Sequence, residues 1–192
     1  MELATFDRDR DLDAVKRVWK EVGWVRGEAG RLADFLDGSD CMVARLDGEA
    51  ECLVACANGS IRYEEFPDTA TDLSMCAVTA VTTSHVARRL GAARRLTALS
   101  LAEQAQSGAE VARLGMFEQG FYDTVGFGTG NYVNRFMFDP SQLKVTHRFR
   151  VPKRLTKDDW RVMRNAMIAR KRGHGSCVVL PEGFSKGETQ GL

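Results

Sequence analysis

Apolar residues near the start of the chain recur every three or four positions, which is the spacing of one face of an α-helix. They follow an Asp-rich segment, and acidic side chains favour the first turn of a helix. The pattern predicts a helix over 11–24 and a shorter helix over 28–36 that ends at Asp37-Gly38. The core face of the first helix is predicted to hold Leu12, Val15, Val18, Trp19 and Val22.

From residue 41 onward, apolar residues form short runs that are typical of β-strands. Asp47-Gly48 predicts a turn between the first two strands. Asn58-Gly59, a sequence typical of two-residue hairpin turns, predicts a second turn. The apolar run that follows the loop at Pro67 predicts a buried central strand. The four predicted strands cover residues 41–46, 51–57, 61–66 and 73–81.

Helices and strands alternate again up to residue 140. The segment after Gly91 predicts a helix that ends near Gln106, and residues 111–117 predict another strand. A short helix is expected to end at Gly126, and residues 131–139 to form a closing strand. The predicted fold class is therefore α/β (α+β).

The composition suits a soluble protein. The chain has 192 residues, of which 44% are apolar and 28% charged, which fits one domain or one domain plus part of a second. No apolar run approaches the roughly 18–20 residues that span a bilayer. The start, MELATFDRDRDLD, lacks the apolar segment of a secretory signal. We therefore expect a cytoplasmic protein without a membrane partner.

Cysteine and histidine usage favours neither disulfides nor a metal centre. The five cysteines are an odd number and contain no C-x-x-C pair, and the three histidines have no metal-ligand spacing. Most of the cysteines lie in apolar runs, so we expect reduced thiols that pack as small apolar side chains. No metal is expected.

The net charge of +1 hides a division along the chain. Residues 1–140 carry 15 Lys/Arg and 22 Asp/Glu, whereas residues 141–192 carry 12 Lys/Arg and 4 Asp/Glu. The change coincides with Asp139-Pro140, and it suggests a boundary there. The basic segment either docks on an acidic neighbour within the molecule or binds a polyanion, and both alternatives stay open.

The segment between the predicted central strand and the next helix has the composition of a phosphate-binding turn. Its small residues let backbone N–H groups approach a ligand, and unpaired N–H groups at a helix start attract anions. Three arginines add positive charge at the same end. The pattern matches neither the Walker loop nor the G-x-G-x-x-G fingerprint. The residues concerned are Arg88, Arg89, Gly91, Ala92, Ala93 and Arg94.

Two linked motifs resemble those of the GNAT superfamily of acetyl-CoA-dependent N-acetyltransferases. Arg88-x-x-Gly91-x-Ala93 follows one predicted strand, and Phe121-Tyr122-x-x-x-Gly126-Phe127 follows the next. The resemblance covers residues 1–138 and implies a GNAT fold for them, with a mixed central sheet flanked by helices. Within the superfamily the chain looks most like the Eis (enhanced intracellular survival) type. The features shared with that type are His85, the arginine pair before Gly91, Glu118 four residues before Tyr122, and the Tyr-x-x-x-Gly-Phe-Gly turn.

The resemblance implies direct transfer of an acetyl group from acetyl-CoA to a primary amine, on a small cationic molecule or a protein lysine. It implies Tyr122 as the general acid that protonates the departing thiolate, and Glu118 as a general base or an anchor for the amine. Without the resemblance, Tyr122 reads as a core aromatic residue and Glu118 as a helix cap. The implied acetyl-CoA-binding residues are Thr79, Ala80, Val81, Arg88, Arg89, Leu90, Gly91, Ala92, Ala93, Arg94 and Phe117.

Residues 139–192 form a basic extension in this reading, resembling only the start of a second GNAT-like domain. Thr156-x-x-Asp159 is expected to cap a basic helix that runs to about Arg172, followed by a strand over 176–180 and a flexible tail over 182–192. Eis-type proteins are longer, and a C-terminal carboxylate serves as their base. The resemblance therefore leaves the base open here.

A second function stays open from the sequence. The domain would then be a catalytically silent acyl-CoA-binding regulatory module whose basic segment, 144–172, contacts an acidic partner. A nucleic-acid partner is not favoured, and self-association to a homo-oligomer through residues 141–192 is a third alternative. Release of CoA thiol on addition of an amine would distinguish the enzyme from the binding module.

Overall fold

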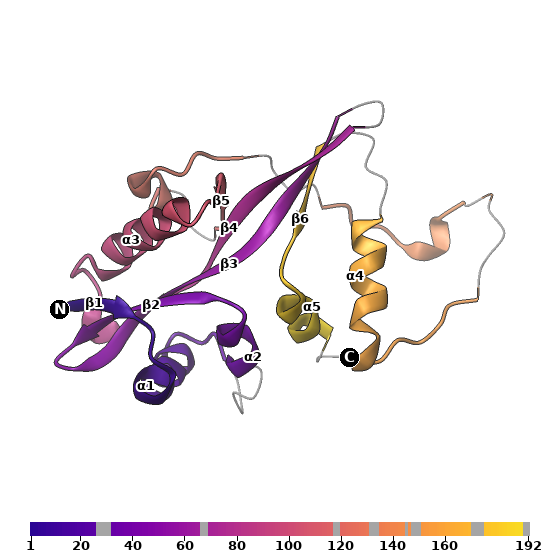
Figure 1. The fold of residues 1–192 in the computed structure, drawn as a ribbon. Coiled ribbons are helices and arrows are strands. Elements are labelled where there is room, and N and C mark those ends of the chain that lie inside the picture. The colour runs from indigo at the N-terminus through magenta and orange to yellow at the C-terminus, as the bar shows by residue number, and fades with distance from the viewer. Residues whose placement is uncertain are drawn as a thin grey trace.

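The computed structural model describes residues 1–25, 32–65, 69–116, 120–130, 135–144, 146, 151–169 and 175–189 of the chain. Its centre is a six-stranded sheet in the order β1-β2-β3-β4-β5, with β6 paired to β3 (Figure 1). The β4–β5 pair is parallel and the other pairs are antiparallel, so the sheet is mixed. The strands are β1 Glu2–Thr5, β2 Asp40–Leu46, β3 Glu49–Glu65, β4 Thr69–Thr83, β5 Val111–Arg113 and β6 Gly175–Val179.

Two helices cover opposite faces of the sheet. Because successive strand residues point to opposite faces, Val43 of β2 packs with α1, whereas Met42 packs with α3. The α1 face buries Val18 and Trp19, and the α3 face buries Leu96. This arrangement confirms the predicted fold class. The helices are α1 Arg8–Glu21, α2 Leu32–Asp37, α3 Ala92–Gln106, α4 Trp160–Ile168 and α5 Glu182–Thr189.

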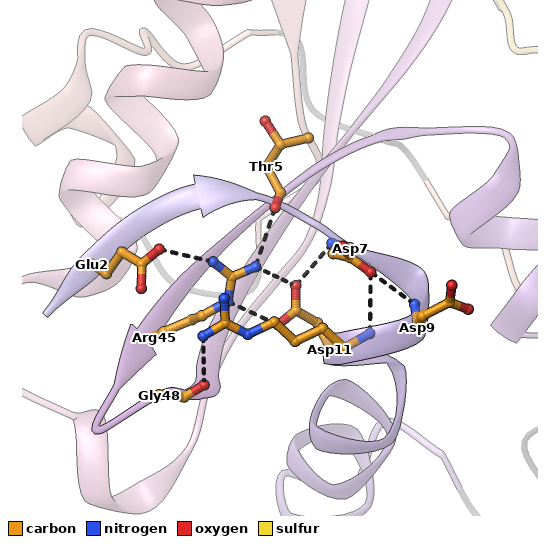
Figure 2. Close-up of polar contacts among 8 residues, drawn as sticks. Glu2, Thr5, Asp7, Asp9, Asp11, Arg45 and Gly48 are labelled. Atoms are coloured by element: carbon orange, nitrogen blue, oxygen red, sulfur yellow. Dashed lines mark hydrogen bonds and ion pairs between the residues drawn. The ribbon is translucent and has the colours of Figure 1, made fainter.

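A buried ion pair joins α1 to the edge of the sheet (Figure 2). Arg45 is 5% exposed and Asp11 is 1% exposed, and two hydrogen bonds of 2.9 and 2.7 Å connect the guanidinium to the carboxylate. Glu2 of β1 lies 3.1 Å from the same guanidinium, and the Thr5 carbonyl accepts from it at 3.5 Å. The first turn of α1 is capped by Asp7, which accepts from two backbone N–H groups. These contacts hold β1, α1 and β2 together.

Asn58-Gly59 does not form the predicted turn, so that prediction was wrong. β3 runs straight through the pair, with Asn58 opposite Cys76 and Gly59 opposite Met75 of β4. A Cβ atom on Gly59 would lie 2.4 Å from the carbonyl oxygen of Val179 at the end of β6. Glycine at this position therefore permits the close approach of another strand, and not a reversal of the chain.

Other elements differ from the prediction in extent. β5 is a short strand, because it pairs only with residues 75–77 of β4. Residues 135–139 form no strand, and Met137 there is 90% exposed; residues 131–134 lie outside the described part of the chain. Residues 182–189, expected within a flexible tail, form α5. α2 covers part of the helix predicted over 28–36, and α4 covers part of the helix predicted to run to Arg172. Residues 28–31 and 170–172 lie outside the described part of the chain.

The C-terminal segment docks on the distal half of β3. β2 pairs with β3 up to Cys56, and β6 then pairs with Ser60–Glu64 along the same strand. α5 contacts α2 through the rings of Phe184 and Phe35, whose centroids are 4.8 Å apart. Figure 1 shows α4 and α5 on this side of the long β3–β4 hairpin. None of the helices in the described ranges has the length and apolarity needed to cross a bilayer.

Candidate functional site

A β-bulge interrupts β4 near its C-terminal end. Leu53 pairs with Thr82 and Ala55 pairs with Thr79, so Ala80 and Val81 together oppose the single residue between them on β3. Ala80 has φ +52°, a left-handed conformation that costs a non-glycine residue about 1–2 kcal/mol. A bulge leaves an extra residue outside the hydrogen-bonded ladder, so backbone groups of this segment become available to a ligand.

Two side chains hold the bulge from the α1 face. The indole N–H of Trp19 donates to the Thr82 hydroxyl oxygen at 2.9 Å, and that hydroxyl donates to the Ala80 carbonyl at 3.3 Å. All three residues are buried. Helical periodicity predicts Trp19 only as a core residue, and no sequence pattern marks Thr82. The available signal was the indole N–H itself, which needs an acceptor wherever it is buried.

The loop from β4 to α3 ends at an open helix N-terminus. Ser84 accepts from the Ala87 N–H and caps a short 3-10 turn, η1 His85–Ala87. Arg89 and Gly91 then adopt left-handed φ values of 64° and 74°. Gly91 caps α3 without a side-chain hydrogen bond, and no described atom lies within 4 Å of the position a Cβ would take. Gly91 and the arginines near it are exposed, and the first N–H groups of α3 have no intrahelical partner, which is a setting that attracts anions.

Carboxylates from α1 and β3 anchor this loop. Glu21 accepts from the His85 backbone N–H and lies 3.0 Å from its Nδ1 atom. Arg17 lies 3.9 Å from Glu21 and 2.7 Å from Glu51, whose backbone carbonyl accepts from the Ser84 N–H. Burial alone would raise the pKa of Glu51, but hydrogen bonds from Arg17 and Ser84 outweigh it and lower that pKa. Neither Glu21 nor Glu51 was predicted from the sequence.

Tyr122 begins a second short 3-10 turn, η2 Tyr122–Val125, which ends at Gly126 with φ 92°. Its ring lies edge-on to Phe121 at 5.0 Å and to Phe127 at 6.1 Å. Phe127 and Val81 pack against the same buried cluster, and η2 contacts α3. Burial raises the pKa of Tyr122 above its ordinary value of 10, so the phenol is protonated at neutral pH. An acid is thereby placed on the side of the sheet that carries α3.

The structure gathers most of the predicted site residues along one continuous path. The path runs from the bulge at residues 79–81 through the loop to the N-terminus of α3, and η2 packs beside that helix. Phe117 and Glu118 lie outside the described residues. The arrangement combines a backbone bulge, an anion-attracting helix start and a neutral phenol, which are groups that can bind a phosphate-bearing thioester and protonate a leaving thiolate.

No protein-family model matches the sequence, and no curated protein matches it significantly. Solved structures do match. A conserved protein from Enterococcus faecalis, described as a probable N-acyltransferase, superposes with a TM-score of 0.68 at 11% identity, over 97% of this chain and 47% of its own. Eis1 from Mycobacterium abscessus gives a TM-score of 0.55 at 17% identity, over 64% of this chain and 30% of its own.

An aminoglycoside N-acetyltransferase solved in complex with CoA gives a TM-score of 0.51 at 14% identity, over 72% of this chain and 99% of its own. At these identities the likeness shows the fold, which is the one shared by GNAT acetyltransferases. The chain spans about half of the Enterococcus protein and under a third of Eis1.

Proposed function

We propose that this chain is an N-acetyltransferase that transfers the acetyl group of acetyl-CoA directly to a primary amine. The observation that carries the proposal is the left-handed bulge at Ala80, followed along the chain by the open N-terminus of α3 at Gly91. One offers backbone groups to a thioester, and the other offers unpaired N–H groups and arginines to a pyrophosphate. A single loop joins the two, as a long, phosphate-bearing acyl donor requires.

The donor would lie along this path. Its pantetheine arm would follow the backbone of Thr79, Ala80 and Val81, and Phe117 would border the acetyl end. The pyrophosphate would lie at the first turn of α3, where the exposed guanidinium groups compensate its charge. The residues assigned to the pyrophosphate are Arg88, Arg89, Leu90, Gly91, Ala92, Ala93 and Arg94.

The chemistry needs a neutral amine, a polarised carbonyl and a proton for the leaving sulfur. The amine nitrogen attacks the thioester carbon, and the Val81 N–H stabilises the oxyanion that forms. The C–S bond then breaks, and the thiolate takes its proton from the Tyr122 hydroxyl. Burial raises the pKa of Tyr122, so the phenol is still protonated when the thiolate forms beside it. A thiol pKa of roughly 8.5 lies below that of the phenol, so this transfer is uphill by itself and is completed when solvent returns a proton to the phenolate. Glu118 would accept the amine proton or anchor the cationic acceptor.

Two of the buried thiols, Cys41 and Cys52, are poorly suited to form a cysteine intermediate. Burial raises the pKa of Cys41 to about 12 and that of Cys52 to about 11, so these thiols stay protonated at neutral pH. All five cysteines are free. A protonated, buried thiol is a poor nucleophile, whereas a direct attack by the amine needs no thiolate on the protein.

The test is a calorimetric titration with acetyl-CoA, with CoA and desulfo-CoA as controls. An assay of thiol release then follows in the presence of a polyamine, an aminoglycoside or a lysine peptide. We expect micromolar binding and amine-dependent release. Binding without release would favour the silent acyl-CoA-binding module, and no binding by folded, monodisperse protein would overturn the proposal.

The variant Gly91→Asp tests whether the pyrophosphate binds at the start of α3. The new side chain projects into the open space at the start of α3 and places a negative charge there, so acetyl-CoA binding should be lost. Gly108→Asp is the matched control, because Gly108 also has a left-handed φ, +97°, and open space at the Cβ position, but lies beyond the other end of α3. Equal effects of the two variants would place the pyrophosphate elsewhere.

A further inference from the structure

The bulge at Ala80 is a strained conformation that its surroundings must hold. Ala80 carries a side chain yet has φ +52°. A non-glycine residue keeps this left-handed conformation only where surrounding contacts stabilise it. Two contacts link the bulge to α1: Trp19 of α1 donates to the Thr82 hydroxyl at 2.9 Å, and Thr82 of β4 donates to the Ala80 carbonyl at 3.3 Å. The Thr82 hydroxyl thus accepts a hydrogen bond from α1 and donates one to the bulge.

A hydrogen bond to the Ala80 carbonyl also orients the next N–H group. The peptide unit is planar and trans, so the N–H of Val81 points opposite to the C=O of Ala80. The carbonyl is directed toward Thr82 and the α1 side, which turns the Val81 N–H away from α1. The side chains agree with this division, since Ala80 packs in the cluster beneath α1 and Val81 packs against the cluster beneath α3.

We infer that Trp19 and Thr82 are positioning residues for acyl transfer, which together aim the Val81 N–H at the acetyl carbonyl. The inference rests on the proposed function, and neither residue touches the donor. Both are buried, at 3% and 5% exposure, so water does not compete for their hydrogen bonds. Trp19 is in turn held between the rings of Trp24 and Phe35, whose centroids lie 5.4 and 5.8 Å from its own.

Thr82→Val removes the hydroxyl with little change in volume, and Thr82→Ser keeps it. Thr97→Val is the matched control, because Thr97 is also fully buried but its hydroxyl has no hydrogen-bond partner among the described residues. Thr82→Val should lower kcat by about ten- to a hundred-fold, somewhat less than removal of an oxyanion donor, with the KM for acetyl-CoA within about threefold of wild type. Thr82→Ser should retain most of kcat, and Thr97→Val should leave it unchanged.

Trp19→Phe keeps an aromatic ring but removes the donor, and it should lower kcat in the same direction as Thr82→Val. Amide hydrogen exchange over residues 79–83, which flank the bulge in the ladder with β3, gives a second readout, without substrate: it should accelerate in Thr82→Val and not in Thr97→Val. Unchanged kcat and unchanged exchange in Thr82→Val, or an equal loss in Thr82→Ser, would overturn the inference. Absence of thiol release by the wild-type chain would instead count against the proposed function, and the exchange measurement would still decide whether the hydroxyl holds the bulge.

Discussion

Arg45→Met should destabilise the protein strongly, because it leaves a buried charge without its partner. In the native structure two hydrogen bonds of 2.9 and 2.7 Å join Arg45 to Asp11, which is only 1% exposed. After the substitution the carboxylate keeps one donor among the described residues, the Asp7 N–H at 2.8 Å. Breaking a buried pair in this way costs about 3–5 kcal/mol of unfolding free energy. For a chain of this size each kcal/mol lowers Tm by about 2–4 °C, so a fall of roughly 6–20 °C is expected.

Arg62→Met is the control that isolates the effect of burial on the stability loss. Arg62 and Asp72 make the same two-pronged contact, with both hydrogen bonds at 2.9 Å, but their side chains are 34% and 47% exposed. An exposed pair contributes about 1 kcal/mol or less. Urea and thermal unfolding of both variants should therefore separate them clearly. Equal, small losses would refute the reasoning that burial decides the cost.

The double variant Asp11→Leu/Arg45→Met tests the cause, since it removes both charges. It should be more stable than Arg45→Met alone, because replacing a buried ion pair by apolar residues is often close to neutral.

The contribution of the Asp11–Arg45 pair to stability should also depend on pH. Burial raises the pKa of Asp11, but hydrogen bonds from Arg45 and the Asp7 N–H outweigh it, so the native pKa lies below the ordinary value of 3.8. The pair therefore stabilises the protein above about pH 4, and that contribution is lost as pH falls through the lower native pKa. The gap in Tm between wild type and Arg45→Met should narrow toward pH 3, and a constant gap would contradict this account.

Three further substitutions test the site and the docking of the C-terminal segment. Tyr122→Phe should lower kcat by roughly ten- to a thousand-fold while acetyl-CoA affinity holds, and an equal loss of affinity would remove its role as the acid. Glu21→Ala should weaken acetyl-CoA binding about fivefold, since one hydrogen bond that fixes the loop is worth about 1 kcal/mol; binding of acetyl-pantetheine, which lacks the pyrophosphate, should not change. Gly59→Ala should displace β6 and cost about 1–3 kcal/mol, with faster proteolysis of residues 175–189, whereas Gly130→Ala, where the Cβ meets open space, should not. Equal proteolysis of both glycine variants would show that β6 does not need Gly59.

The elements that depend on local periodicity could be predicted from the sequence. α1 begins and ends within three residues of the predicted helix, and its predicted core face includes Val15, Val18 and Trp19, which are buried. The helix after Gly91 and the central strand were also predicted, because amphipathic spacing and an apolar run are properties of neighbouring residues. The fold class followed from the order of these elements.

Asn58-Gly59 shows where local signals mislead. The pair favours a hairpin turn in isolation, but here both residues continue the ladder with β4. What decides the outcome is β6, from the other end of the chain, whose Val179 carbonyl occupies the space beside Gly59. A glycine that serves a turn and a glycine that serves a close approach look alike in sequence, and only the distant strand distinguishes them.

The bulge in β4 was hidden for a related reason. Its left-handed residue is an alanine, so no glycine marks the position, and the run from Leu73 to Val81 reads as an uninterrupted strand. The group that stabilises the bulge is the indole of Trp19, which is 63 residues from Thr82 in sequence. A helix that periodicity assigns to the core is thus also what sets the direction of a backbone N–H group in the candidate site. Strain that is held by distant side chains leaves no local pattern, which is why motifs could suggest candidate site residues but not the contacts that shape them.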